Sequence, residues 1–265
     1  MNKRELVGRF AGDEDERIIL ARVLDQMERA AQRSVPCATQ FLSPAQRAAA
    51  EGMLDACGVR DPLFFGGYDG AERTVCVFLP DYLTPEDYLA GDELPIGAVE
   101  AAFPAGADLT HRDMLGSLMG LGLTRDRLGD ILLSDGRAQI VAAAEAVPIL
   151  LSQLSKAGRY PLRLREIRLS ELSPAPARVR VIHDTVAALR LDAVAAAGFS
   201  LSRGKAADLI SAGRMSLNHR ECCKADRTVA QGDVLTCRGL GKCVLKTVGG
   251  ASRKGRIIIE MERYL

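Results

Sequence analysis

The C-terminal part of the chain combines an excess of basic side chains with a helix start suited to binding an anion. Residues 180–265 contain 15 Lys and Arg against eight Asp and Glu, whereas residues 1–179 contain 20 against 26. Ser202 predicts a helix start that places Arg203 and Lys205 in the first turn. Free amides there bind phosphate, and basic side chains do not stabilise this end of a helix. We therefore expect Arg203 and Lys205 to be exposed, dispensable for stability, and directed at an RNA backbone.

Residue patterns that would support catalysis, a metal or a nucleotide cofactor are not found in the sequence. The seven cysteines follow no ligand spacing. His111-Arg112-Asp113 lacks the asparagine of a kinase loop, and the glycines of 66–70 precede a strand instead of opening a helix. Asp192 lies in an Arg-Leu-Asp tripeptide that resembles the catalytic one of pseudouridine synthases, without its threonine-glycine continuation. We expect a structural Asp192, no metal, no cofactor and no enzymatic activity.

A second group of arginines, Arg112, Arg125 and Arg127, flanks one predicted helix in the middle of the chain. These three either form a second RNA-binding patch or are solvated surface residues, and the sequence leaves both readings open. The chain has no tryptophan, five tyrosines and seven phenylalanines. Stacking on bases is therefore expected to be minor, which favours structured RNA over single strands.

The N-terminal region, residues 1–83, predicts helices followed by a strand pair. Apolar side chains at helical spacing indicate a helix over 14–33, and Ser43-Pro44 predicts a capped helix that continues to about Cys57. Leu63–Phe65 and Thr74–Leu79 then read as two strands around a glycine-rich turn.

The central region, residues 84–172, predicts a ferredoxin-like (RRM-like) β-α-β-β-α-β module. Its expected strands are 94–102, 129–133, 139–141 and 162–169. One expected helix opens at Thr110 with a capping box to Asp113, and the other runs from about Glu145 to Lys156 and ends at Gly158. That strand and helix order is shared by RNA-binding and unrelated proteins, so it predicts a fold and not a function.

A Pro- and Ala-rich linker at residues 173–179 precedes the basic C-terminal domain, residues 180–265, and completes an α+β fold class. The segments RLD, S-R, G-x-x-x-x-N and G-D-x-L follow one another between about residues 188 and 242. They resemble the RNA-binding module named after ribosomal protein S-four, an α-α-β-β unit or αL motif. The resemblance implies RNA contacts by Arg203, Lys205, Arg214, Asn218, Arg238 and Lys242, to which we add Arg253 and Lys254.

Four further segments indicate a family for nearly the whole chain beyond residue 40. They are GGYDGAER (66–73), LPDY (79–82), HRDMLGSLMGLGLTRDRLGDIL (111–132) and VGGASRKGRI (248–257). Together they resemble the YlmH-type proteins of the bacterial division gene cluster. The resemblance implies association with the ribosome, where relatives act on stalled large subunits that carry peptidyl-tRNA.

The function expected from these observations is that of a non-catalytic factor that binds structured rRNA or tRNA on the large subunit during rescue of stalled translation. An RNA-modifying enzyme with an unrecognised active site and a cell-division interaction protein are the alternatives. The N-terminus lacks the apolar segment of a signal peptide, and no stretch is long and apolar enough to cross a bilayer. We expect a cytoplasmic protein, without a membrane partner, that acts as a monomer.

Overall fold

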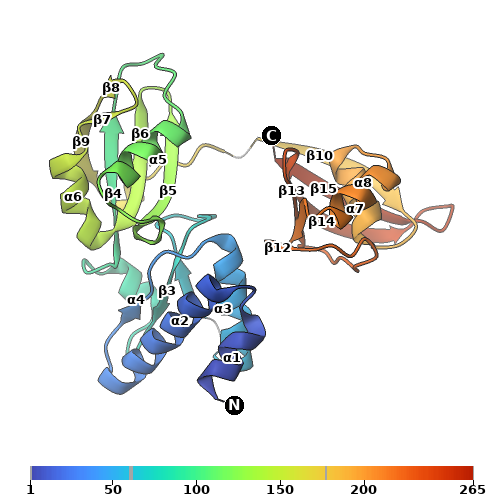
Figure 1. The fold of residues 1–265 in the computed structure, drawn as a ribbon, viewed down its shortest axis with the longest axis horizontal. Coiled ribbons are helices and arrows are strands. Elements are labelled where there is room, and N and C mark those ends of the chain that lie inside the picture. The colour runs from blue at the N-terminus through green and yellow to red at the C-terminus, as the bar shows by residue number, and fades with distance from the viewer. Residues whose placement is uncertain (1, 60–61, 177, 265) are drawn as a thin grey trace. The chain divides into compact units, whose positions relative to one another are not determined.

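The structure is a computed structural model that describes residues 2–59, 62–176 and 178–264. It divides into two compact units, Met1–Ala175 and Pro176–Leu265, which are described separately (Figure 1). The domain limits predicted at residues 83, 172 and 180 stay predictions. The mixed helix and antiparallel-sheet content agrees with the predicted α+β class.

Helices that begin at side-chain caps form the N-terminal part of the first unit. Asp13 accepts a hydrogen bond from the Glu16 amide at 2.8 Å, and Ser43 forms a capping box with Gln46. These caps start the two predicted helices, whose buried faces share one apolar cluster. Two short helices were not predicted from the sequence. The four helices are α1 (Lys3–Phe10), α2 (Glu14–Arg33), α3 (Pro44–Ala56) and α4 (Pro85–Ala90).

A three-stranded sheet lies beside these helices, one strand larger than the predicted pair. β2 (Leu63–Phe65) and β3 (Val75–Phe78) pair antiparallel as expected. The additional β1 (Cys37–Ala38) pairs with the other edge of β3, so β3 is central. Two residues are too few for a periodic signal, which explains why the sequence did not reveal β1.

The central region has the predicted ferredoxin-like topology. Its sheet order is β5-β6-β4-β9 with every neighbouring pair antiparallel. Both helices, α5 and α6, pack on one face of this sheet around a continuous apolar core (Figure 1). The elements are β4 (Ile96–Ala102), α5 (His111–Gly120), β5 (Leu128–Ser134), β6 (Arg137–Ala143), α6 (Val147–Gln153) and β9 (Arg163–Ile167).

The end of the second central helix was predicted wrongly. The helix α6 stops at Gln153, and the next residues form a small hairpin of β7 (Lys156–Ala157) with β8 (Tyr160–Pro161). Gly158 lies in the turn of that hairpin with φ of 55°, and does not cap a helix. The Leu162 amide donates to the Ser155 carbonyl at 2.9 Å. This tertiary pairing outweighs the local helical preference that the prediction used.

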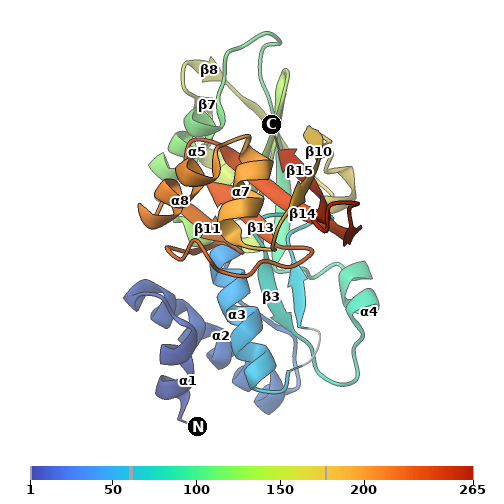
Figure 2. The ribbon, with the colours of Figure 1, turned by 90° about the vertical axis from the view of Figure 1, so that its right-hand side faces the viewer.

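The second unit contains two helices on one face of a six-stranded antiparallel sheet (Figure 2). The sheet order is β10-β15-β14-β13-β11-β12. A Cβ on Gly198 would lie 2.7 Å from the Met261 methyl and 2.8 Å from the Cys243 sulfur, so only glycine lets the first helix approach the sheet this closely. The elements are β10 (Val179–Val186), α7 (Leu191–Phe199), α8 (Arg203–Ser211), β11 (Met215–Leu217), β12 (Arg220–Glu221), β13 (Val234–Cys237), β14 (Gly241–Ala251) and β15 (Ile257–Tyr264).

Candidate RNA-binding surfaces

The start of α8 is built as the sequence predicted. Ser202 caps the helix by accepting a hydrogen bond from the Lys205 amide at 3.2 Å. Ala206, Leu209 and Ile210 bury the opposite face of the helix in the core. Arg203 and Lys205 are exposed in the first turn, where the helix dipole repels cations and attracts an external anion.

Arg203 has a structural role that the sequence analysis did not assign to it. Its guanidinium binds the Asp192 carboxylate through Nε at 3.1 Å and Nη2 at 3.4 Å. Arg190 holds the same carboxylate through two further bonds of 3.2 Å. The Asp192 side chain is only 7% exposed, so these cations compensate a buried charge that joins the starts of α7 and α8. This contact argues against the expectation that Arg203 is dispensable for stability, which stays a prediction, whereas a structural Asp192 agrees with the prediction.

The protonation of Asp192 reflects this double pairing. Burial acts to raise the pKa of the carboxyl group, but the hydrogen bonds from Arg190 and Arg203 outweigh it and lower the pKa below the ordinary value. The carboxylate is thus charged at neutral pH and already occupied by two guanidinium groups. A group so held is poorly placed to act as a nucleophile or a base.

A second basic group lies around the turn between β13 and β14. The Arg214 guanidinium donates to the Arg238 carbonyl at 3.1 Å, which brings these two residues together. Gly239 adopts φ of 88° in this turn, a conformation that favours glycine. At the start of β14 the Lys242 ammonium lies 4.4 Å from the centre of the Tyr264 ring. The covered ring is not a free stacking platform for a base.

Asn218 serves the fold of the hairpin between β11 and β12. Asn218 and His219 have φ of 49° and 66°, as a two-residue hairpin turn requires. The Asn218 amide group donates to Asp233 at 2.8 Å and accepts from the Val234 amide at 2.9 Å. Its predicted RNA contact stays a prediction, but both ends of the side chain already have a protein partner.

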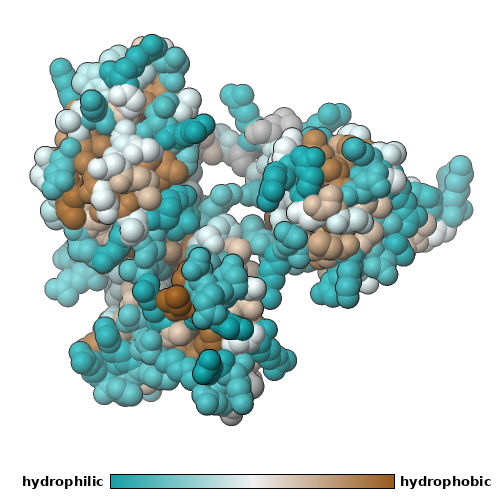
Figure 3. Space-filling view, in the orientation of Figure 1, coloured by the Kyte–Doolittle hydropathy of each residue, from teal (hydrophilic) through white to brown (hydrophobic). Residues whose placement is uncertain are grey.

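Arg253 and Lys254 occupy the exposed tip of the hairpin between β14 and β15. This tip is hydrophilic in the surface view (Figure 3). Lys242 and Ala251 are nine positions apart along β14, which corresponds to about 30 Å of strand. The predicted basic RNA-binding residues of this unit therefore lie in three groups: the start of α8, the β13–β14 turn and the hairpin tip.

Part of the open face of the central sheet is covered by the rest of the first unit. RRM modules bind bases on the sheet face opposite their helices. Here Ile96 and Val141 on that face pack against Phe41, Val75 and Val77 from the N-terminal region. Next to them Gln139, 2% exposed, donates to Glu100 and to the Glu171 carbonyl. These two parts of the face are thus occupied by this chain's own residues, whereas Ala102, Arg137 and Arg163 at its other end are exposed.

Two of the sequence motifs meet at this contact. The Asp130 carboxylate on β5 accepts hydrogen bonds from the Tyr68 hydroxyl at 2.7 Å and from the amides of Glu72 and Arg73 at 2.7 and 3.1 Å. Burial and the bond to Asp130 raise the pKa of Tyr68, which stays a neutral donor. The GGYDGAER and GDIL segments therefore join the N-terminal sheet to the central module.

The three central arginines do not form one patch. Arg112 lies at the N-terminal end of α5, about 12 Å along the helix axis from Gly120. Arg125 and Arg127 lie beyond the other end, in the short 3-10 helix η1 (Arg125–Arg127). Both line a groove of about 980 Å³ in the first unit, together with Arg22 and Arg29 of α2 and with Arg73. Sequence reasoning missed these last three, because only the fold brings residues so far apart together.

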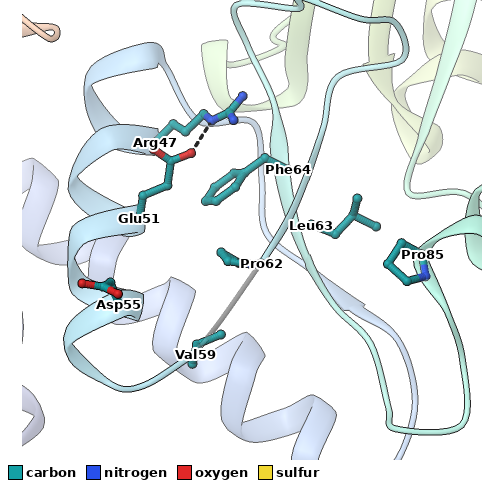
Figure 4. Close-up of a pocket in the computed structure, with 8 residues that line it drawn as sticks. All are labelled: Arg47, Glu51, Asp55, Val59, Pro62, Leu63, Phe64 and Pro85. Atoms are coloured by element: carbon teal, nitrogen blue, oxygen red, sulfur yellow. Dashed lines mark hydrogen bonds and ion pairs between the residues drawn. The ribbon is translucent and has the colours of Figure 1, made fainter. Parts of the chain in front are cut away.

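A second hollow of the first unit lies between α3 and β2 (Figure 4). Arg47 lies over the Phe64 ring at 4.8 Å and binds Glu51 at 2.8 Å. Its cation is thus already paired with both a ring and a carboxylate, which leaves little charge for an anionic ligand.

Among the described residues, no three His, Cys, Asp or Glu side chains gather in a way that could hold a metal ion. No helix in the described parts of the chain is long and apolar enough to cross a bilayer.

Comparisons with known proteins place this arrangement in a family. Residues 96–171 match the model of a putative RNA-binding domain in YlmH, and residues 189–235 match the S4 domain. The "Ribosome-associated protein quality control protein P2" of Bacillus subtilis (strain 168) is 35% identical over 225 residues, which cover 85% of this chain and 86% of that protein. A solved structure, "Cell division protein ylmH from Streptococcus pneumoniae", is 25% identical, with a TM-score of 0.49 over 61% of this chain and 96% of that one. The chain belongs to the YlmH family of proteins with an S4 domain.

Proposed function

We propose that the chain is a non-catalytic RNA-binding factor that associates with the ribosome and acts in quality control of stalled translation. The observation that carries this proposal is the coincidence of two RNA-binding domain matches with a relative, similar over most of both chains, that is named for ribosome-associated quality control. Its RNA would be structured rRNA or tRNA on the large subunit, bound by one copy of the chain in the cytoplasm.

The geometry of the second unit supports recognition of an RNA backbone. Lys205 at a helix start and Arg238 in a turn are exposed cations on rigid elements, as phosphate contacts require. Phe199 is buried and Tyr264 is covered by Lys242, so aromatic stacking has little part. Shape and charge, rather than base identity, would then select the RNA.

The proposal that the chain is not an enzyme is supported by the state of Asp192. This carboxylate is the one that the sequence offered for RNA modification, and it is buried between Arg190 and Arg203. Incubation of the chain with rRNA followed by mass spectrometry of the nucleosides should reveal no new modification. A modified nucleoside that depends on Asp192 would favour the enzyme instead.

Sedimentation in a bacterial lysate tests the association directly. The tagged full-length chain should migrate with large subunits in a sucrose gradient, and more of it should do so after translation is stalled. Increasing salt should release it, because the contacts are to phosphates. A chain that stays at the top of the gradient even at low salt would contradict the proposed function.

A further inference from the structure

The groove of the first unit has arginines on both walls. One wall is a stripe of α2 on which Arg22, Gln26 and Arg29 follow one another at helical spacing. The facing wall is η1 with Arg125 and Arg127, and residues 38–42 form the floor between them. An anion in the groove would therefore meet guanidinium groups from two sides.

The arginines of this groove differ in how far they are already neutralised. Arg127 forms an ion pair with Glu145. The lining also holds four carboxylates, Asp15, Asp25, Asp126 and Glu145, against its five arginines. Of these carboxylates, Asp25 is bound by Lys3 at 2.5 Å. Among the described residues no ion pair involves Arg22, Arg29 or Arg125, and Arg22 donates only to the neutral amide of Gln40 at 3.1 Å. Three exposed cations thus lack a carboxylate partner, which is the condition for binding an external anion.

Arg73 holds the η1 wall in place from below. Its Nε donates to the Leu128 carbonyl and its Nη2 to the Arg125 carbonyl, both at 2.7 Å. The Phe41 amide adds a bond to the Asp126 carbonyl at 2.9 Å. The backbone of η1 is therefore tied to the floor of the groove on both sides, so Arg125 projects from a rigid support.

The dimensions and lining of the groove select one class of ligand. A volume of about 980 Å³ is that of a site for a small molecule or one strand, and is too small for a duplex. Phe41 on the floor is only 2% exposed, so the groove lacks a stacking platform. Because the groove is too small for a duplex, an RNA bound there is a single strand held by its phosphates through the guanidinium groups, without the base stacking that other single-strand sites use.

We propose that this groove binds a single strand of RNA through its phosphates, with Arg22, Arg29 and Arg125 as the contacts and Arg73 as a positioning residue. The partly covered face of the central sheet supports this assignment, because it reduces the surface on which such a module usually binds bases. The inference rests on the proposed function for RNA as the ligand. The proposed site differs from the second patch predicted from the sequence. It excludes Arg112 and includes arginines of α2, and its ligand is single-stranded instead of structured RNA.

Binding of a fluorescent ten-nucleotide oligouridylate to the full chain tests the groove. The variant R22A/R29A/R125A should bind this RNA at least about tenfold more weakly at 100 mM salt, and the slope of log K against log salt should become shallower by about 2. The control R4A/R9A/R17A removes the same charge from α1 and from another face of α2, and should bind like the wild type. R22K/R29K/R125K keeps the charge and should recover much of the affinity.

A blunt RNA hairpin distinguishes the groove from the second unit. Its affinity should change little in R22A/R29A/R125A, because a duplex does not enter the groove. Equal oligouridylate affinity in the groove variant and its control would overturn the proposal, as would equal losses for oligouridylate and hairpin. Sedimentation tests whether the chain associates with ribosomes, and oligouridylate binding tests the groove. Either proposal can therefore be rejected without the other.

Discussion

Asp192 and Arg203 show how one residue of the S4 domain can serve both folding and binding. They lie eleven positions apart in the sequence, and their ion pair joins the starts of two helices. Arg203 also lies in the first turn of α8, where a phosphate would bind. If a substitution of Arg203 weakens RNA binding, the loss could therefore come from the missing phosphate contact or from a displaced α8. Lys205, two residues on in the same turn, carries the same charge without an ion pair among the described residues, and so separates the two effects.

We predict unequal stability effects for charge reversal at Arg203 and Lys205. R203E places a second carboxylate against buried Asp192 and should lower the free energy of unfolding by about 2–4 kcal/mol. K205E puts an acidic side chain at a helix N-terminus and should change it by less than about 0.5 kcal/mol. Urea unfolding of the second unit measures both values. Similar effects of the two variants would mean that the Asp192 pair contributes little.

The same carboxylate gives a pH dependence with a defined sign. Because the folded-state pKa of Asp192 lies below its unfolded value, the native state gains stability above the ordinary carboxyl pKa of about 3.9, and loses it as pH falls below that value. The difference in unfolding free energy between wild type and D192N should be largest near pH 7 and shrink toward pH 3. A difference that is constant with pH would show that the carboxylate charge is not what stabilises the helix starts.

At the scale of elements, the sequence was sufficient to predict where a helix begins when a capping residue determines that position. Ser43, Thr110 and Ser202 each begin a helix as predicted. The end of α6 was not predictable, since pairing across a short hairpin determines it. The candidate RNA-binding residues were predicted as one set, mainly from the S-four resemblance, but the separation of the basic ones into three groups follows from strand lengths and pairings.

The hairpin between β14 and β15 is the element whose role is simplest to isolate. Arg253 and Lys254 are exposed at its tip, so replacing both with alanine should leave the thermal midpoint unchanged. If each neutralises one phosphate, the salt slope for an RNA hairpin should become shallower by about 2. R180A/K246A removes equal charge from strands of the same sheet and serves as control. A slope equal to the wild-type slope would remove the hairpin tip from the RNA-binding surface.

At the scale of the molecule, two compact units divide the chain, and the second carries a net positive charge whereas the first is net negative. The groove of the first unit illustrates what sequence reasoning cannot supply. Arg125 comes from a segment far in sequence from Arg22 and Arg29 of α2, and no local pattern relates it to them. The occlusion of the central sheet likewise depends on contacts between the N-terminal region and β4 and β6.

We predict that residues 176–265 fold alone and bind a structured RNA with steep salt dependence. This unit has its own apolar core, as a part of the chain that folds alone requires. If about four phosphates are contacted, affinity should fall by roughly two decades between 50 and 200 mM salt. Circular dichroism tests whether the fragment folds, and fluorescence anisotropy measures its affinity for the RNA. An affinity that does not change between about 50 and 200 mM salt would exclude an electrostatic mechanism.

The central claim, that the S4 domain attaches this chain to ribosomal RNA, is tested most directly by binding to purified large subunits. The variant K205E/R214E/R238E reverses three basic residues from the α8 start and the β13–β14 turn, and R4E/R9E/R17E reverses three in the first unit. With folding verified by circular dichroism, pelleting assays should show at least about a hundredfold loss of subunit affinity for the first variant, since both contact and repulsion change. The second should remain within about threefold of the wild type. Equal affinities for the two variants would contradict the account.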